Sequence, residues 1–193
     1  MGESDATIVS MILAGDPRGL NRFLSRYGHM LAEYIRALTG DDNDLFSAVY
    51  EDVLVDILKQ LRVLAGTHET PEIKKLSGKG ELLRPIFESA ARTVRRRFPD
   101  LLKASEEPKA SPLPVDDLAA FANSIDHVDF KTLLEGLAGP ERELLVLRYR
   151  LGFDYAEISN IIREARVQLE ERLVNARHHF RARLFASQQK AMV

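Results

Sequence analysis

The sequence predicts an all-α protein made of two small helical domains joined by a proline-rich linker. Apolar residues recur at three- and four-residue steps through most of the chain, and no strand-like alternation of useful length appears. Between residues 103 and 114 this periodicity stops, and three prolines lie among small and charged residues. We therefore expect one helical domain over residues 1–102, a linker over 103–114 and a second helical domain over 115–193. The predicted cores are Leu20, Phe23, Tyr27, Leu31, Tyr34, Val53, Ile57 and Leu61 in the first domain and Leu144, Leu147, Ile158, Ile161, Leu173 and Phe180 in the second.

The first predicted helix begins near Asp16 and Pro17, because proline is favoured in the first turn of a helix. Asp41, Asp42 and Asp44 follow this helix and precede the next apolar pattern. These carboxylates could bind a divalent cation or cap the next helix, and the cap is the favoured interpretation. The helix places the following apolar residues on one face: Leu20, Phe23, Leu24, Tyr27, Leu31, Tyr34, Ile35 and Leu38.

Two more helices are predicted in the first domain, over residues 45–64 and 81–97. Pro85 should kink the second of these unless it lies in the first turn. That helix ends in a basic run: Arg92, Arg95, Arg96 and Arg97. The run favours a surface for nucleic-acid phosphates or an acidic partner, and the alternative is a solvated helix end stabilised by the helix dipole.

Composition and termini exclude several classes of protein. Lysine plus arginine (27) nearly balance aspartate plus glutamate (29), so any nucleic-acid surface must be local. The sequence has no cysteine, its five histidines are mostly scattered, and no nucleophile or phosphate-loop motif appears. We expect no enzyme activity, metal or cofactor. The first residues do not resemble a signal peptide and no apolar run is long enough to span a bilayer, so we expect a soluble cytoplasmic protein.

Several stretches resemble the sigma factors of bacterial RNA polymerase. ERELLVLRYRLGFDYAEIS (141–159) followed by RLVNAR (172–177) resembles sigma region four, a helix-turn-helix module. ILAGDPR (12–18), FLSRY (23–27) and YIRALTGD (34–41) resemble the start of region two in the extracytoplasmic-function class. Together they cover most of the chain in the family's order.

This resemblance implies a dissociable initiation subunit without catalytic activity of its own. Region two of the family binds the polymerase core and opens the minus-ten element, and region four reads the minus-thirty-five element. The implied partners are core polymerase, promoter DNA and possible regulators such as an anti-sigma protein, with no membrane contact.

The residues that match the polymerase-binding surface differ from the family pattern. Phe46 and Ser47 lie where relatives carry an acidic pair, and only Glu51 remains of a later glutamine-glutamate pair. With Tyr50 they form the predicted polymerase-binding set, which has lost charge.

The turn of the helix-turn-helix also differs. Relatives have a glycine, an apolar residue and a serine or threonine cap, where this chain has Arg163, Glu164 and Ala165. The surrounding residues are strong helix formers, so we expect residues 155–184 to approach one continuous helix with at most a shallow break. Its apolar stripe comprises Ile158, Ile162, Ala165, Leu169, Leu173, Ala176, Phe180 and Leu184.

The expected DNA-facing residues of this segment are Arg166, Arg172 and Arg177, which could contact backbone phosphates. Glu170 and Glu171 would oppose DNA binding, and glutamate-arginine pairing along a charged helix face is the alternative. Two functions follow. The first is a divergent sigma factor that directs promoter-specific initiation, and the second is a sigma-derived regulatory protein that has lost promoter reading and binds a protein partner.

Overall fold

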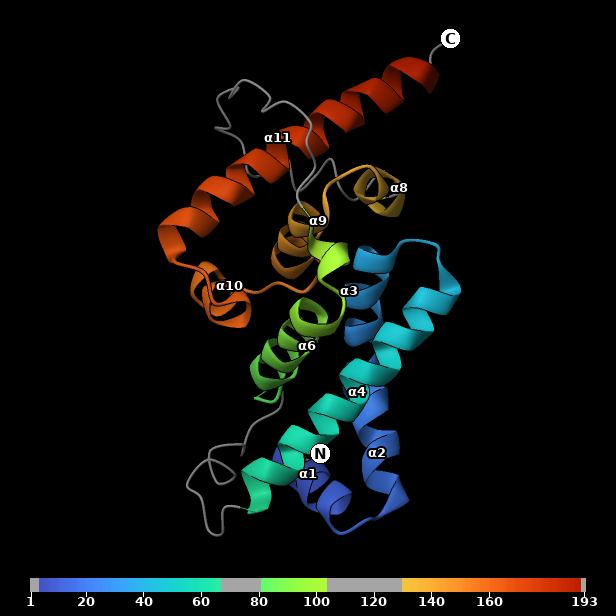
Figure 1. Ribbon diagram of the computed structural model, residues 1–193, viewed down its shortest axis with the longest axis vertical. Helices are drawn as coiled ribbons and strands as arrows, with labels where there is room; N and C mark the ends of the chain where they lie inside the picture. Colours follow the sequence, from blue (N-terminus) through green and yellow to red (C-terminus); the bar gives the residue numbers. More distant parts are fainter. Residues whose placement is uncertain (1–3, 67–80, 104–129, 192–193) are drawn as a thin grey trace.

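The computed structural model describes residues 4–66, 81–103 and 130–191 (Figure 1). Within these ranges all regular secondary structure is helical, which confirms the predicted all-α class. No helix in them combines the length and apolar character needed to cross a membrane. Nearly all of the predicted linker lies outside the described residues, and the division into two domains stays a prediction.

The N-terminal helices are α1 (Asp5–Leu13), α2 (Pro17–Phe23) and α3 (His29–Thr39), and a π-helical turn (Leu24–Gly28) joins the last two. The predicted helix start is confirmed, because the Asp16 side chain caps α2. The sequence did not predict α1, whose apolar face lies against α2 and α4.

The next long helices are α4 (Asn43–Gly66) and α6 (Leu83–Arg97). Asp42 accepts a hydrogen bond from the backbone N–H of Leu45 at 2.9 Å, so the capping interpretation of the aspartates is confirmed for this residue. Pro85 lies in the first turn of α6, where a missing backbone donor costs no intrahelical hydrogen bond. The helix therefore continues past it to Arg97.

The remaining elements are short except for the last helix. They are a 3₁₀ turn (Pro99–Leu102), α8 (Phe130–Glu135), α9 (Gly139–Leu145), a π-helical turn (Val146–Arg150), α10 (Tyr155–Ile162) and α11 (Arg166–Ala191).

The prediction of a nearly continuous helix over residues 155–184 is wrong. α10 ends at Ile162, Arg163 takes the left-handed conformation (φ 58°, ψ 46°), and α11 leaves in a different direction (Figure 1). Ala165 is exposed at this turn, whereas every other residue of the predicted stripe is buried. The apolar period continues across the turn because the two helices happen to stay in register.

Most of the residues predicted to form the core are buried. In the N-terminal half these are Phe23, Tyr27, Leu31, Tyr34, Val53, Ile57 and Leu61, and in the C-terminal half Leu144, Leu147, Ile158, Ile161, Leu173 and Phe180. Leu20, also predicted, is only partly buried.

The two halves of the chain share one buried cluster. The ring of Phe87 in α6 lies 5.6 Å from Tyr34 and 5.2 Å from Phe153, in edge-to-face contacts that join both halves. A Cβ added to Gly139 would lie 1.7 Å from the carbonyl oxygen of Leu101, so α9 begins directly against the preceding turn. α6 consequently lies between α4 on one side and α10 on the other (Figure 1).

Candidate nucleic-acid interface

The α10–α11 pair forms a helix-turn-helix whose first helix has a complete capping box. The Asp154 carboxylate accepts a hydrogen bond from the Glu157 backbone N–H at 2.8 Å, and the Glu157 carboxylate accepts one from the Asp154 N–H at 2.8 Å. These contacts fix the first residue of α10 and so help to position the turn that follows its last residue.

Contacts among Ser159, Glu164 and Arg172, which the sequence did not predict, hold the turn without a glycine or a serine or threonine cap. The Glu164 N–H donates to the Ser159 carbonyl at 3.2 Å, and the Ser159 hydroxyl donates to the Glu164 carbonyl at 2.6 Å. Arg172, one of the predicted phosphate ligands, donates instead to the Glu164 carboxylate. Two features of the sequence could have indicated this turn: Ser159, one helical turn before Arg163, and the oppositely charged Glu164 and Arg172.

The first turns of α11 are open to solvent. Val167 is 78% exposed, and its neighbours Arg166 and Gln168 are also exposed, while Leu169 and Leu173 anchor the helix from below. Such an arrangement is typical of a recognition helix, whose N-terminal residues contact base edges. The strong helix formers on both sides of Arg163 had led to the prediction of a nearly continuous helix here.

Among the predicted DNA contacts of α11, Arg166 is accessible and Arg177 is not. Arg166 pairs with Glu170 at 2.7 Å, and an exposed pair of this kind is worth only about 0–1 kcal/mol, so a phosphate can compete for it. Arg177 is 5% exposed and lies beside Tyr149, where burial raises the pKa of the tyrosine hydroxyl. The prediction that Arg177 contacts phosphate therefore does not fit this structure.

Arg95, predicted from its basic run to contact DNA, forms a buried ion pair between the two halves. Glu143 of α9 is 1% exposed and accepts hydrogen bonds from the Arg95 guanidinium at 2.7 and 3.1 Å. It also accepts one from the Tyr34 hydroxyl at 2.6 Å. Burial and the adjacent carboxylate raise the pKa of Tyr34. This cluster connects α3, α6 and α9, so Arg95 has a structural role here.

The rest of the basic run is partly neutralised by α4. Arg96 donates to Asp56 at 2.6 Å, and Arg97 pairs with Asp52 at 2.5 Å. The Arg96 side chain nevertheless stays 59% exposed. Arg92 is partly buried, and its Nε atom meets no hydrogen-bond partner among the described residues. Of the four arginines, Arg96 is the most accessible to a ligand.

The predicted polymerase-binding set divides between two sides of α4. Phe46 stacks on Tyr50 with 5.6 Å between ring centroids, and the Arg36 guanidinium lies 3.9 Å from the Phe46 ring centre. Ser47 and Glu51 are exposed on the outer side. The phenylalanine at position 46 is thus used for packing, and only two of the four residues present polar atoms to a partner.

Histidines and carboxylates do not gather into a metal site in the part of the chain that the structure describes. His179 contacts the Glu141 carboxylate, whereas His178 is buried in the same helix, and burial lowers its pKa.

No protein-family model matches this chain, and no curated protein matches it in sequence. The resemblance to sigma factors stays an expectation from the motifs quoted above.

Proposed function

We propose that the chain is a divergent sigma factor of the extracytoplasmic-function type, with a region-two-like and a region-four-like domain. In this role it binds core RNA polymerase and directs initiation at specific promoters. The observation that carries the proposal is the α10–α11 helix-turn-helix, because its turn is held by specific contacts and the outer side of the first turns of α11 is exposed at Arg166, Val167, Gln168 and Glu171.

DNA recognition would use the exposed side chains at the start of α11. A major groove admits one α-helix, in which arginine pairs with guanine and glutamine pairs with adenine through two hydrogen bonds. Arg166 and Gln168 offer these donors and acceptors, and Glu171 can accept from a cytosine amino group. Polymerase binding would use the outer side of α4, where Ser47 and Glu51 are exposed.

The second candidate is a sigma-derived regulator that has lost promoter reading and binds a protein, such as an anti-sigma or a polymerase surface. It is supported by the basic run of α6, which pairs with carboxylates of the chain itself, and by the burial of Arg177. In that role the same helices would contact protein instead of DNA.

A selection experiment separates the two candidates. Core polymerase with the purified chain would be used to select binding sequences from a random duplex library, and core binding alone would be measured by co-purification. The sigma proposal expects one enriched motif, with affinity lowered by Gln168→Ala by about 5- to 150-fold, which corresponds to about 1–3 kcal/mol per lost base contact. Asn175→Ala, an exposed change farther along α11, is the matched control and should bind normally.

Core binding without an enriched motif would favour the regulator. Equal losses with Gln168→Ala and Asn175→Ala would show that α11 does not read bases through its first turns.

A further inference from the structure

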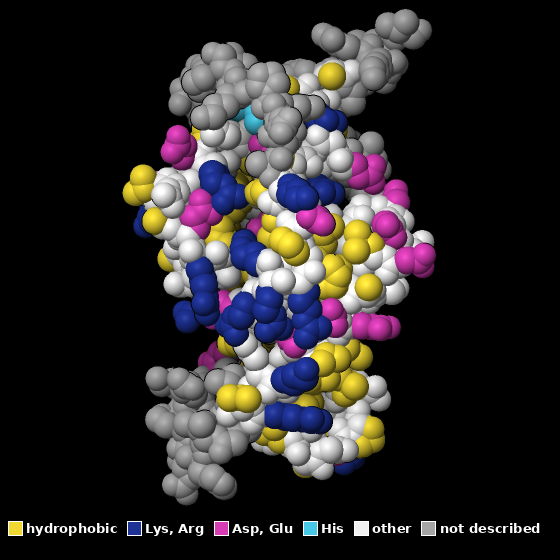
Figure 2. Space-filling model, viewed as in Figure 1, with side chains coloured by type: hydrophobic (Ala, Val, Ile, Leu, Met, Phe, Trp, Pro, Cys, Tyr) yellow, Lys and Arg dark blue, Asp and Glu magenta, His cyan; other side chains and the backbone are white. Residues whose placement is uncertain are grey.

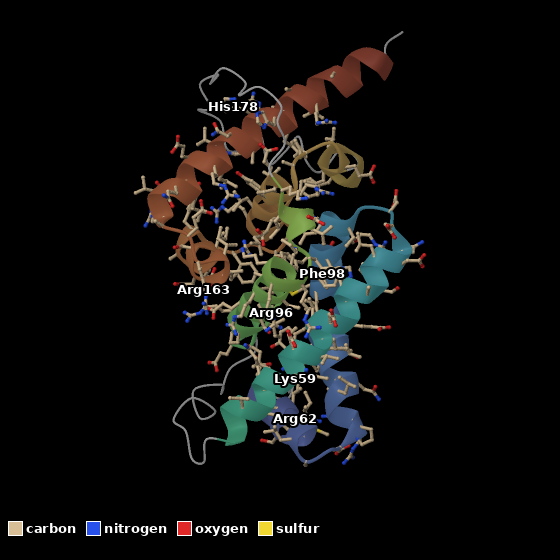
Figure 3. The ribbon with its side chains drawn as sticks, in the orientation of Figure 1. Lys59, Arg62, Arg96, Phe98, Arg163 and His178 are labelled. Atoms are coloured by element: carbon tan, nitrogen blue, oxygen red, sulfur yellow. The ribbon has the colours of Figure 1, made fainter. Side chains whose placement is uncertain are left out.

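Cations from both halves of the chain lie on one face of the molecule. Figure 3 places Lys59 and Arg62 of α4, Arg96 of α6 and Arg163 of the α10–α11 turn along the same side. Figure 2 shows lysine and arginine side chains gathered over the middle of this face, in the same view. We call these four residues the composite cationic face.

The contacts explain why the four residues come together. Lys59 and Arg62 are three residues apart in α4 and so lie on the same side of that helix. The Asp56 carboxylate forms ion pairs with the Lys59 ammonium at 3.9 Å and with the Arg96 guanidinium at 2.6 Å. This shared partner places a cation of α4 next to a cation of α6. α10 packs against α6, and its last turn carries Arg163 to the edge of the same surface.

The face keeps a surplus of positive charge. Arg62 and Arg163 are exposed, and neither makes an ion pair with any residue that the structure describes. The Lys59 and Arg96 side chains are 64% and 59% exposed, and they share one carboxylate. A local cationic surface on a chain of net charge −2 cannot be a consequence of overall composition.

We propose that the composite cationic face binds the phosphate backbone of duplex DNA without reading its sequence. Three of its four cations are arginines, whose planar guanidinium donates two parallel hydrogen bonds to a phosphate. The cations extend across α4, α6 and the α10–α11 turn, as contact with a line of phosphates requires, and Arg163 lies beside the exposed start of α11. A duplex held by α11 can therefore continue over α6 and α4. This binding does not require promoter reading, and it needs both halves in the arrangement seen here.

The test is fluorescence anisotropy with a labelled duplex of scrambled sequence, measured on the full chain over a series of salt concentrations. The double variant Arg62→Gln/Arg163→Gly removes two unpaired cations, and glycine accepts the left-handed turn at position 163. The matched control, Arg18→Gln/Lys103→Gln, removes the same charge from exposed residues outside α4, α6 and α10. Circular dichroism would verify that both variants fold.

We expect the face variant to lower the slope of log K against log salt by about two, one for each lost phosphate contact. The control should keep the slope and bind nearly as tightly as the unmodified chain. Equal losses in both variants, or no duplex binding by the unmodified chain at low salt, would overturn the proposal. Binding to polyglutamate in preference to duplex would also overturn it and assign the face to an acidic protein.

A failure here is distinguishable from failure of the proposed function. Gln168→Ala should leave scrambled-duplex binding unchanged, and the face variant should weaken scrambled and selected duplexes to the same extent. A chain that selects no motif but shows the expected salt slopes would retain the composite cationic face and lose the sigma assignment.

Discussion

Arg163 occupies a backbone conformation that side chains disfavour. Its φ of 58° lies in the left-handed region, which costs an L-residue about 1–2 kcal/mol and costs glycine nothing. Replacing Arg163 by glycine should therefore raise the free energy of unfolding by about 1 kcal/mol, although it removes an exposed arginine. Urea unfolding followed by circular dichroism measures this change.

The control for Arg163 is Arg62→Gly, in the body of α4. Glycine is unfavourable inside a helix by about 0.5–1 kcal/mol, so this variant should be less stable. If Arg163→Gly were destabilising as well, the turn would depend on the arginine side chain and not on its backbone angle.

Single side chains also show what the sequence could and could not predict. Burial followed from helical periodicity, so nearly all predicted core residues were right, and Leu20 was half right. The ion pairs of the arginines could not be predicted from periodicity, because their partners lie far away in the sequence. Arg95 meets Glu143 across 48 positions, and Arg96 meets Asp56 across 40. Nothing near either arginine in the sequence indicates these carboxylates.

The sequence-based prediction of the helices was wrong at two places, the break between α10 and α11 and the short helix α1. The break between α10 and α11 was missed because propensity describes a stretch of chain, whereas a turn is decided by a few hydrogen bonds such as that from the Ser159 hydroxyl to the Glu164 carbonyl. The missed α1 is short, and its buried Asp5 does not fit an apolar pattern. The Asp5 carboxylate accepts hydrogen bonds from Arg26 and Tyr27, which fixes α1 against the start of the next helices.

The contact between α3 and α9 depends on a polar cluster that can be tested by removing one oxygen atom. In Tyr34→Phe the Glu143 carboxylate loses its 2.6 Å hydrogen bond while both residues stay buried. Hydrogen bonds to a charged group contribute about 1.5–3 kcal/mol, so the free energy of unfolding should fall by that amount. Equilibrium urea unfolding provides the measurement.

Tyr50→Phe removes the same atom from a partly buried tyrosine whose hydroxyl bonds to no described residue, and it should change stability by less than about 0.5 kcal/mol. Equal effects of the two tyrosine variants would mean that the Glu143 cluster adds nothing beyond ordinary packing.

The stability of the folded chain should also depend on pH through His178. Burial in the folded state, with Arg181 and Arg177 nearby, lowers the pKa of this imidazole below its ordinary value of about 6.5. Below that pH His178 binds a proton more readily in the unfolded chain than in the folded chain. Acidification therefore favours unfolding, and the His178 contribution to stability is complete above pH 6.5 and is lost as the pH falls. His178→Gln should lessen the loss of unfolding free energy between pH 8 and pH 5.

His29→Gln, at an exposed position of α3, is the matched control for the loss of one imidazole. A His178→Gln profile that parallels the unmodified chain would show that other groups dominate acid sensitivity.

The shared core has a consequence for unfolding that the linker pattern in the sequence does not suggest. Two domains on a flexible tether would unfold separately, but Phe87 contacts side chains of both halves and Glu143 bonds to two helices of the N-terminal half. We expect one cooperative transition. Hydrogen exchange of peptides from α4 and α10, measured across a urea series, should show the same midpoint.

Alanine variants of two buried leucines, one in each half of the chain, test whether the halves unfold together. Leu31→Ala in α3 and Leu144→Ala in α9 should each destabilise the chain by about 2–5 kcal/mol. In one cooperative unit, either variant lowers the midpoint of both peptides together, because the α4 and α10 amides become exposed only when the common core opens. If Leu31→Ala shifted only α4 and Leu144→Ala only α10, the halves would be independent domains. The composite cationic face would then be a transient arrangement, and its contribution to DNA binding would fall with the fraction of closed molecules.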